Sequence, residues 1–116
     1  AVGELVTMSE AIVKVTVDGE TMITAAEGNG PVNALDLALR KDLGKYQKYI
    51  EDVELSDYRV RVFQGGTDAV TRVLIEFSDS AGEHWSTVGV STNVIDASFQ
   101  ALTDSINYKL LKSGAR

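Results

Sequence analysis

The sequence predicts an α+β domain made of two βββα repeats, and three observations lead to this expectation. Apolar and polar residues alternate in two separate regions, which is the pattern of half-buried strands. Each region is followed by apolar residues at helical spacing. Shifting the chain by 63 positions places Gly30-Pro31-Val32-Asn33-Ala34 over Asn93-Val94-Ile95-Asp96-Ala97, so the two helix starts correspond.

The first repeat is predicted over residues 4–44. Ala11, Val13 and Val15 alternate with Ile12 and Lys14, and the Asp18-Gly19 pair that follows is typical of a hairpin turn. Residues 20–27 are predicted as the returning strand, and the first repeat is βββα if residues 4–8 count as a short strand before the first. The helix is then predicted by the stripe Val32, Leu35, Leu39 and Leu43, with Gly44 as its stop.

Residues 45–54 are polar and are predicted to connect the repeats, and the second repeat covers residues 55–112. Strands are expected around residues 58–62, 72–77 and 84–90, with the turn SDSAGE between the last two. The helix is predicted by the stripe Ile95, Phe99, Leu102, Ile106 and Leu110. Two such units predict an antiparallel sheet with both helices on one face and a pseudo-twofold relation between the repeats.

Composition excludes several functions. The formal charge of −6 and the pI near 4.6 argue against a nucleic-acid partner or an anionic membrane surface. With no cysteine, disulfides, thiolate nucleophiles and cysteine zinc sites are excluded, and a reducing cytoplasm fits. No apolar run is long enough for a membrane span, and the first residues lack a signal-peptide pattern. We therefore expect a soluble, cytoplasmic protein.

The sequence offers no catalytic or metal-ligating set. Its one histidine, His84, lies beside Trp85 in a predicted strand and has no evident partner for a triad or a metal site. Acidic residues gather around the first helix and the connector, but without the spacing of a metal-binding loop, which favours a solvated face. These residues are Asp36, Asp42, Glu51, Asp52, Glu54 and Asp57. We expect no catalysis and no metal in this chain.

The segment GNGPVNAL, residues 28–35, raises the question of a phosphate loop. It lacks the third glycine of a dinucleotide loop, Pro31 removes a donor, and the surrounding hairpin is antiparallel, so phosphate binding is not expected. Gly30 is instead predicted as an N-cap with Pro31 at the first helical position. Asn93 is a stronger cap for the second helix, with Asp96 three residues on. A helix N-terminus still attracts anions, including the carboxylate of a free amino acid.

Four stretches resemble one known family over about residues 5–112: AAEGNGPVNALDLALRKDL, LSDYRVRV, GTDAVTRVLIEFSD and WSTVGVSTNVIDASFQALTDSINYKL. They are similar to the C-terminal regulatory domain of 2-isopropylmalate synthase and citramalate synthase, and the last stretch looks more like the citramalate branch. The resemblance implies a homodimer that binds an end-product amino acid at the dimer interface. It also implies a parent transferase that condenses acetyl-CoA with a 2-keto acid on a metal-dependent TIM barrel, which this sequence lacks. The domain itself would need no cofactor.

The resemblance assigns an effector site for isoleucine or leucine, with isoleucine favoured, and so implies feedback inhibition in branched-chain amino-acid biosynthesis. An amino acid needs donors for its carboxylate, acceptors for its ammonium group and an apolar lining. The predicted donors are the N–H groups near Gly28, Asn29, Gly30, Ser91, Thr92 and Asn93. Backbone carbonyls, Asp57 or Asp96 would face the ammonium group. The aliphatic lining would be Val32, Leu55, Tyr58, Val62, Ala69 and Ile95.

Other interpretations of the same residues stay open. Val62 and Ile95 also suit a core, and Asn93 and Asp96 also suit helix caps alone. A dimerisation module without an effector site is therefore the alternative function. Leu37, Tyr46 and Tyr49 fall outside the apolar stripes, and they are either scattered surface residues or part of a subunit interface.

Overall fold

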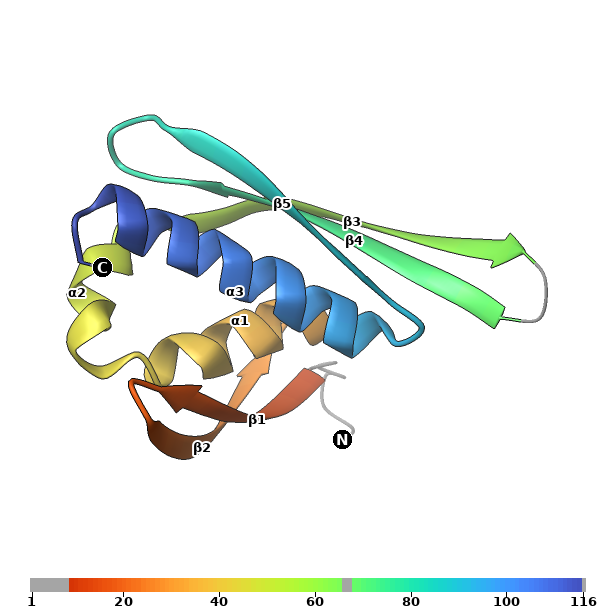
Figure 1. Ribbon diagram of the computed structural model, residues 1–116, viewed down its shortest axis with the longest axis horizontal. Coiled ribbons are helices and arrows are strands. Elements are labelled where there is room, and N and C mark those ends of the chain that lie inside the picture. The colour runs from red at the N-terminus through yellow and green to blue at the C-terminus, as the bar shows by residue number, and fades with distance from the viewer. Residues whose placement is uncertain (1–8, 66–67, 116) are drawn as a thin grey trace, which may run out of the picture. The chain divides into compact units, whose positions relative to one another are not determined.

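The computed structural model describes residues 9–65 and 68–115, and the chain divides into two compact units, residues 1–44 and 45–116. Figure 1 shows antiparallel strands and helices in each unit, which confirms the α+β class. Within the described residues the strands form two sheets rather than one, because strands pair only inside their own unit. The predicted strand at residues 4–8 lies outside the described residues. Across the described residues, no helix has both the length and the apolar composition needed to cross a bilayer.

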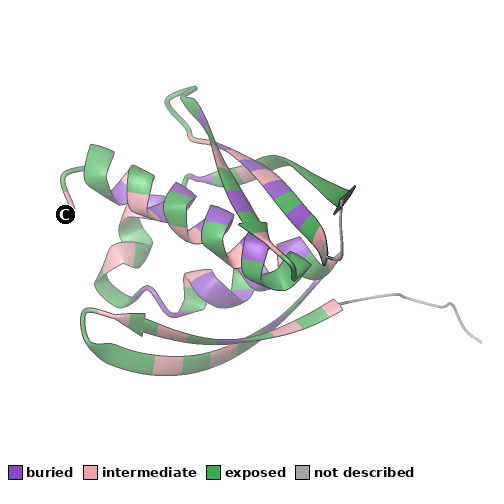
Figure 2. Cartoon of the chain, turned by 45° about the vertical axis from the view of Figure 1, so that its right-hand side comes forward, coloured by how far each residue is buried: buried purple, intermediate pink, exposed green. Residues whose placement is uncertain are grey.

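The first unit is a hairpin covered by one helix. Strands β1 (Ser9–Val17) and β2 (Glu20–Gly28) pair antiparallel around the predicted Asp18-Gly19 turn, where both residues have positive φ. Helix α1 (Pro31–Lys41) packs on one face of this hairpin. The predicted stripe Val32, Leu35, Leu39 and Leu43 is buried, as Figure 2 shows for the inner face of the helix. Gly30 is the N-cap and Pro31 the first helical residue, as predicted.

The connector is more structured than its polarity suggests. It contains the 3₁₀ turn η1 (Gly44–Tyr46) and the short helix α2 (Gln47–Ile50), and α2 packs against helix α3 (Val94–Lys112). Ile50 and Val53 are buried. Val53 lies beyond the end of α2, and its N–H donates to the carbonyl of Ile50 at 3.0 Å.

The second unit is a three-stranded antiparallel sheet in the order β3-β4-β5, with α3 on one face (Figure 1). The strands are β3 (Glu54–Gly65), β4 (Asp68–Ser78) and β5 (His84–Ser91), so β3 and β4 are longer than predicted. β5 pairs only with residues 71–78 of β4. The β3–β4 hairpin therefore extends beyond β5 as a two-stranded ribbon that includes Phe63 and Val70.

The centre of this unit lies between α3 and strands β4 and β5. Val73, Ile75 and Phe77 of the central strand are fully buried, which confirms the predicted alternation. In α3, Leu102, Ile106 and Leu110 are buried as expected. The prediction that Ile95 belongs to this buried stripe is wrong, because Ile95 is 45% exposed, and Phe99 is only half-buried.

The face of α3 that packs on the sheet includes small residues where the predicted stripe had Ile95 and Phe99. Ala97, Ala101 and Ser105 have no exposed surface, and they face the strands. Strand β5 meets them with Gly89, where an added Cβ would lie 1.8 Å from the carbonyl oxygen of Ala97. The helix therefore lies so close to β5 that large side chains do not fit between the two backbones.

One partly buried polar pair recurs in the two units with the predicted shift of 63 positions. The Thr24 hydroxyl donates to a carboxylate oxygen of Asp42, and Thr87 shares a hydrogen bond of 2.6 Å with Ser105. In both cases a strand threonine meets a polar residue of the covering helix or its C-cap. The repeat is therefore present in side-chain contacts as well as in element order.

We expect Gly89→Ala to destabilise the chain by about 3 kcal/mol, because the new methyl group collides with rigid helix backbone and α3 must move away from β5. Urea denaturation would measure the loss. Ser86→Ala, at an exposed position of the same strand, is the matched control and should change stability by less than about 0.5 kcal/mol. Equal stability of the two variants would contradict the close-approach argument.

Candidate functional site

The predicted site residues belong to both units. In the first unit, Gly28, Asn29, Gly30 and Val32 surround the start of α1. Gly28 is buried, and a Cβ there would lie 2.4 Å from Oδ1 of Asn33. The Asn29 N–H already donates to that oxygen at 3.0 Å, while the Val32 side chain is buried in the core.

The α1 entrance retains uncapped donors. Gly30 provides no side-chain cap, and Pro31 has no N–H. The first internal bond of the helix joins the N–H of Ala34 to the carbonyl of Gly30 at 2.9 Å. The N–H groups of Val32 and Asn33 thus lie in the first turn, where a helix has no carbonyl of its own to offer them.

The α3 entrance is satisfied by its own residues. Oδ1 of Asn93 accepts from the N–H groups of Ile95 at 2.7 Å and Asp96 at 3.3 Å, which confirms Asn93 as the N-cap. The N–H of Asn93 donates to the Ser91 hydroxyl at 3.2 Å. Thr92 is exposed. Of the donors predicted for a carboxylate here, the N–H of Asn93 is therefore already used, and so are the neighbouring N–H groups of Ile95 and Asp96.

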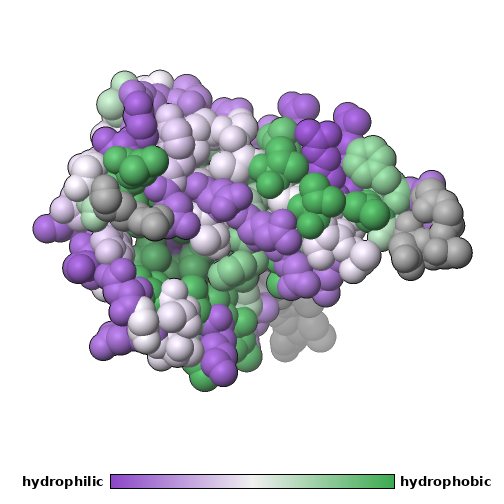
Figure 3. Space-filling view, in the orientation of Figure 1, coloured by the Kyte–Doolittle hydropathy of each residue, from purple (hydrophilic) through white to green (hydrophobic). Residues whose placement is uncertain are grey.

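Strand β3 leaves apolar side chains uncovered on the face where α3 packs. Tyr58, Val60 and Val62, which we name the β3 strip, lie in rows with the buried residues Ile75, Val73 and Thr71 of β4. Because paired residues share a face, the strip points to the α3 side. Yet α3 packs on β4 and β5, and the strip residues are 45%, 42% and 57% exposed. Figure 3 shows apolar side chains at the surface where β3 and β4 extend.

The pairing register separates the other predicted lining residues by face. Leu55 pairs with Phe77, and Ala69 pairs with Gln64, so both lie on the strip side. Ser91 pairs with Thr71 and completes the row that begins at Val62. Asp57 pairs with Glu76 on the opposite face, so the structure does not bring its carboxylate together with the strip.

Sequence reasoning missed two residues of this face, Val60 and Thr71. Val60 alternates with Arg59 and Arg61 and is the middle of the strip. Thr71 is buried between Val62 and Ser91 and is polar. The alternation of β3 contained the signal for Val60. The position of Thr71 required the strand register, which the sequence alone does not give.

Leu37, Tyr46 and Tyr49 differ in environment. Leu37 is exposed on α1, whereas Tyr46 and Tyr49 are half-buried. Each tyrosine lies under the ammonium group of the preceding lysine, Lys45 or Lys48, at 5.2 Å from the ring centre. Their part in a subunit interface stays a prediction.

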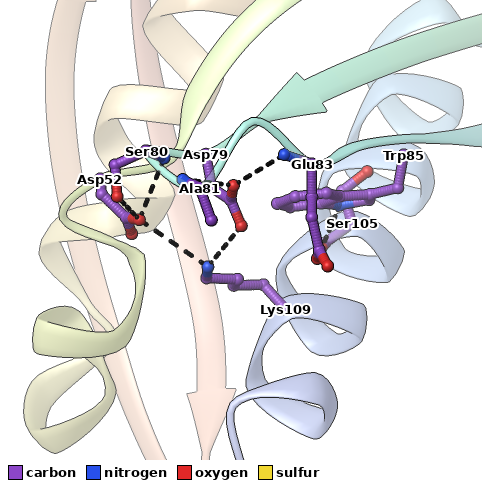
Figure 4. Close-up of polar contacts among 8 residues, drawn as sticks. All are labelled: Asp52, Asp79, Ser80, Ala81, Glu83, Trp85, Ser105 and Lys109. Atoms are coloured by element: carbon purple, nitrogen blue, oxygen red, sulfur yellow. Dashed lines mark hydrogen bonds and ion pairs between the residues drawn. The ribbon is translucent and has the colours of Figure 1, made fainter.

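A charged cluster joins α3 to the β4–β5 turn and the connector, as Figure 4 shows. Nζ of Lys109 donates to Oδ2 of Asp79 at 2.8 Å and lies 3.9 Å from Asp52. The Ser80 hydroxyl donates to Asp52 at 2.6 Å. The other oxygen of Asp79 accepts the N–H groups of Ala81 and Glu83, both at 3.0 Å.

These contacts fix the charge state of the cluster. The hydrogen bond from Lys109 lowers the pKa of Asp79, and the bonds from Ser80 lower the pKa of Asp52. The Asp79 carboxylate in turn raises the pKa of Lys109. All three groups thus stay ionised and paired near neutral pH, which suits a structural ion network better than acid–base exchange.

Asp36 and His84 also have ion-pair partners rather than the surroundings of a catalytic group. Asp36 is buried, which raises its pKa, while Arg40 at 3.0 Å opposes that shift. His84 lies on the surface, 3.3 Å from Glu76. Among the described residues, no three His, Cys, Asp or Glu side chains converge as metal ligands.

A family profile described as "LeuA allosteric (dimerisation) domain" matches residues 3–110. The chain belongs to this family. The chain is 56% identical over 108 residues to an (R)-citramalate synthase of Geobacter sulfurreducens, which covers 91% of this chain and 20% of that protein. The chain is also 47% identical over 111 residues to the (R)-citramalate synthase of Sulfolobus acidocaldarius, and this match covers 89% of the chain and 20% of that protein. The chain is 34% identical over 97 residues to a "Probable 2-isopropylmalate synthase" of Methanopyrus kandleri, and this match covers 84% of the chain and 19% of that protein.

The chain thus spans about a fifth of the length of the curated relatives it matches. The resemblance predicted from the sequence is confirmed: this is the regulatory and dimerisation domain of the citramalate and 2-isopropylmalate synthase family. The β3 strip and the two helix entrances are accordingly features of a LeuA domain.

We expect Asp79→Asn to lower stability at neutral pH, since the amide keeps the acceptor for the turn but loses the ion pair with Lys109. A lowered carboxyl pKa stabilises the fold above the unfolded value near 3.8 and loses this effect as pH falls through and below it. The difference between wild type and variant should therefore shrink as pH falls from 5 to 3. Urea unfolding across this range would measure it, with the exposed Glu51→Gln as control. A difference independent of pH would refute the ion-pair explanation.

Proposed function

We propose that this LeuA domain forms a homodimer, binds isoleucine or leucine, and mediates feedback inhibition of an acetyl-CoA-dependent 2-keto-acid synthase. The observation that carries the proposal is the β3 strip, which offers three contiguous apolar side chains on a face that α3 covers only in part. Contiguous exposed apolar side chains mark interfaces and ligand sites. Both roles accord with a family described as allosteric and dimerising.

An aliphatic amino acid suits this surface chemically. Val62 and Ala69 provide apolar contacts on one face, and the Tyr58 ring limits the depth of a site through its size and rigidity. In the first unit taken by itself, the α1 entrance has first-turn N–H groups without a side-chain cap, so it could accept an anion. At the α3 entrance, a carboxylate would compete with Asn93 for the same donors.

We propose isoleucine as the preferred effector, because the chain is more similar to the compared citramalate synthases than to the compared 2-isopropylmalate synthase. Leucine and isoleucine differ only in the position of one methyl branch. A misplaced methyl group in an apolar pocket costs about 1–3 kcal/mol, so selectivity should be about 10- to 200-fold.

The rest of the proposed parent enzyme would carry the chemistry. In this proposal, the acetyl-CoA site and the divalent metal lie in a catalytic domain outside this sequence, and the present domain needs no cofactor. The effector would act by binding one state of the enzyme more tightly than another. A cytoplasmic location accords with the absence of cysteine.

A dimerisation module without an effector site is the second candidate. The self-capped α3 entrance favours it, because an N-terminus satisfied by Asn93 needs no ligand. In that case a second copy alone would cover the β3 strip.

We expect the wild-type chain to sediment as a dimer at micromolar concentration, and Val60→Glu to weaken dimerisation about 30-fold or more by placing a charge in the apolar contact. Val88→Glu is the matched control, since Val88 is equally exposed but lies on the opposite face of the sheet. Sedimentation of the wild type as a monomer, with and without amino acid, would count decisively against the dimer.

We expect calorimetry to detect isoleucine binding and weaker leucine binding, and Tyr58→Ala to weaken both or remove the preference. Phe63→Ala is the control, because Phe63 is 48% exposed on the other face of the same strand. Unchanged affinities in Tyr58→Ala would remove Tyr58 from the site. If the wild-type dimer bound isoleucine, leucine and valine equally poorly, the dimerisation-only function would replace the proposal.

A further inference from the structure

The outer face of the β3-β4-β5 sheet, opposite α3, contains a concentration of positive charge. Arg59 and Arg61 on β3 and Arg72 on β4, which we name the arginine cluster, surround a hollow of about 240 Å³ together with Leu74. The register explains the grouping, because Arg61 pairs directly with Arg72 and Arg59 pairs with Leu74. Three guanidinium groups thus meet on one face of a chain whose net charge is −6.

The cluster is poorly neutralised. Directly opposed like charges on neighbouring strands destabilise a sheet. Arg59 has a contact with Asp57 at 3.4 Å, and both side chains are largely exposed. Arg61 and Arg72 have no ion pair or hydrogen bond with another described side chain. The nearby Glu76 instead lies 3.3 Å from His84.

We propose that the arginine cluster binds a small anion with two or more negative charges, of the polycarboxylate or phosphate-ester class. Guanidinium groups hold carboxylate and phosphate oxygens through paired, charge-assisted hydrogen bonds. A single anion between Arg61 and Arg72 would relieve their repulsion and satisfy both. Leu74, with Val88 beside it on β5, offers an apolar contact for the carbon part of such a ligand.

The size of the hollow favours a small molecule over a polyanion. A nucleic acid needs a basic surface long enough to follow its backbone, whereas here three arginines surround one hollow of about 240 Å³. The remaining exposed residues of this face are of mixed character, with Val88 and Val90 on β5 and with Asp57 and Ser86 toward the other end of the strands. The cluster is therefore suited to one compact ligand.

The test uses citrate and pyrophosphate as separate probes, each compared with sodium chloride at equal ionic strength. We expect at least one probe to raise the melting temperature of the chain beyond the chloride effect and to bind in calorimetry with a Kd in the millimolar range or tighter. Binding of citrate alone assigns the polycarboxylate class, and binding of pyrophosphate alone assigns the phosphate class. Equal melting temperatures in both probes and in chloride would overturn the proposal.

Variants separate a built site from general charge attraction. Arg61→Gln and Arg72→Gln should each weaken probe binding at least about tenfold, because each removes charge-assisted hydrogen bonds. The same variants should leave the probe-free chain at least as stable, since they remove the opposed charges. Lys14→Gln, an exposed position of β1 with the same charge change, should bind like the wild type. Equal weakening in Lys14→Gln would refute a specific cluster.

This inference is independent of the proposed amino-acid site. Tyr58 lies on the α3 side of the sheet, whereas the arginine cluster lies on the outer side. Tyr58→Ala should therefore retain citrate or pyrophosphate binding, and Arg61→Gln should retain amino-acid binding. Loss of the anion in Tyr58→Ala, with the fold intact by circular dichroism, would contradict two separate sites.

Discussion

The close approach of α3 to β5 at Gly89 determines how the second unit is built. Because the helix backbone nearly touches the strand, the facing helix positions hold only alanine and serine, and large side chains move to the edges of the contact. The helix is thereby held over β4 and β5. Strand β3 is left beside it with apolar side chains exposed, so the packing that stabilises the unit also creates the surface proposed for assembly and effector binding.

The sequence predicted those parts of the structure that depend on local periodicity. The alternation around Val73 and the N-caps Gly30 and Asn93 are all found. What failed depends on contacts between elements. Ile95 has helical spacing but is exposed, because the small residues set the buried face. The opposite faces of the neighbours Asp57 and Tyr58 follow from the strand period of two, whereas the bulge between Leu55 and Asp57 gives no sequence signal of its own.

The two repeats share a plan but not their detailed chemistry. At equivalent positions, Thr24 meets the carboxylate of Asp42, whereas Thr87 meets the hydroxyl of Ser105. One oxygen of Asp42 is buried without a partner among the described atoms, while the hydroxyl pair is satisfied. The helix entrances also differ in how their N–H groups are satisfied, since α3 has a side-chain cap and α1 has none. The second repeat also has one buried oxygen without a partner among the described atoms, Oγ1 of Thr103, so the repeats differ in the helix entrance rather than in the number of such groups. The uncapped entrance of the first repeat costs stability but leaves N–H groups available for function.

The ribbon formed by the β3–β4 hairpin beyond β5 has a consequence for how binding could be transmitted. Phe63 and Val70 pair across two strands only, and a two-stranded ribbon in water is marginally stable. Opening this segment should cost less free energy than opening the sheet beneath α3, so its amide hydrogens should exchange sooner. A ligand or subunit that contacts the ribbon itself would stabilise its closed form and so slow the exchange of its amide hydrogens. Because Ala69 of the proposed lining lies in this ribbon, hydrogen exchange there would report occupancy of the site.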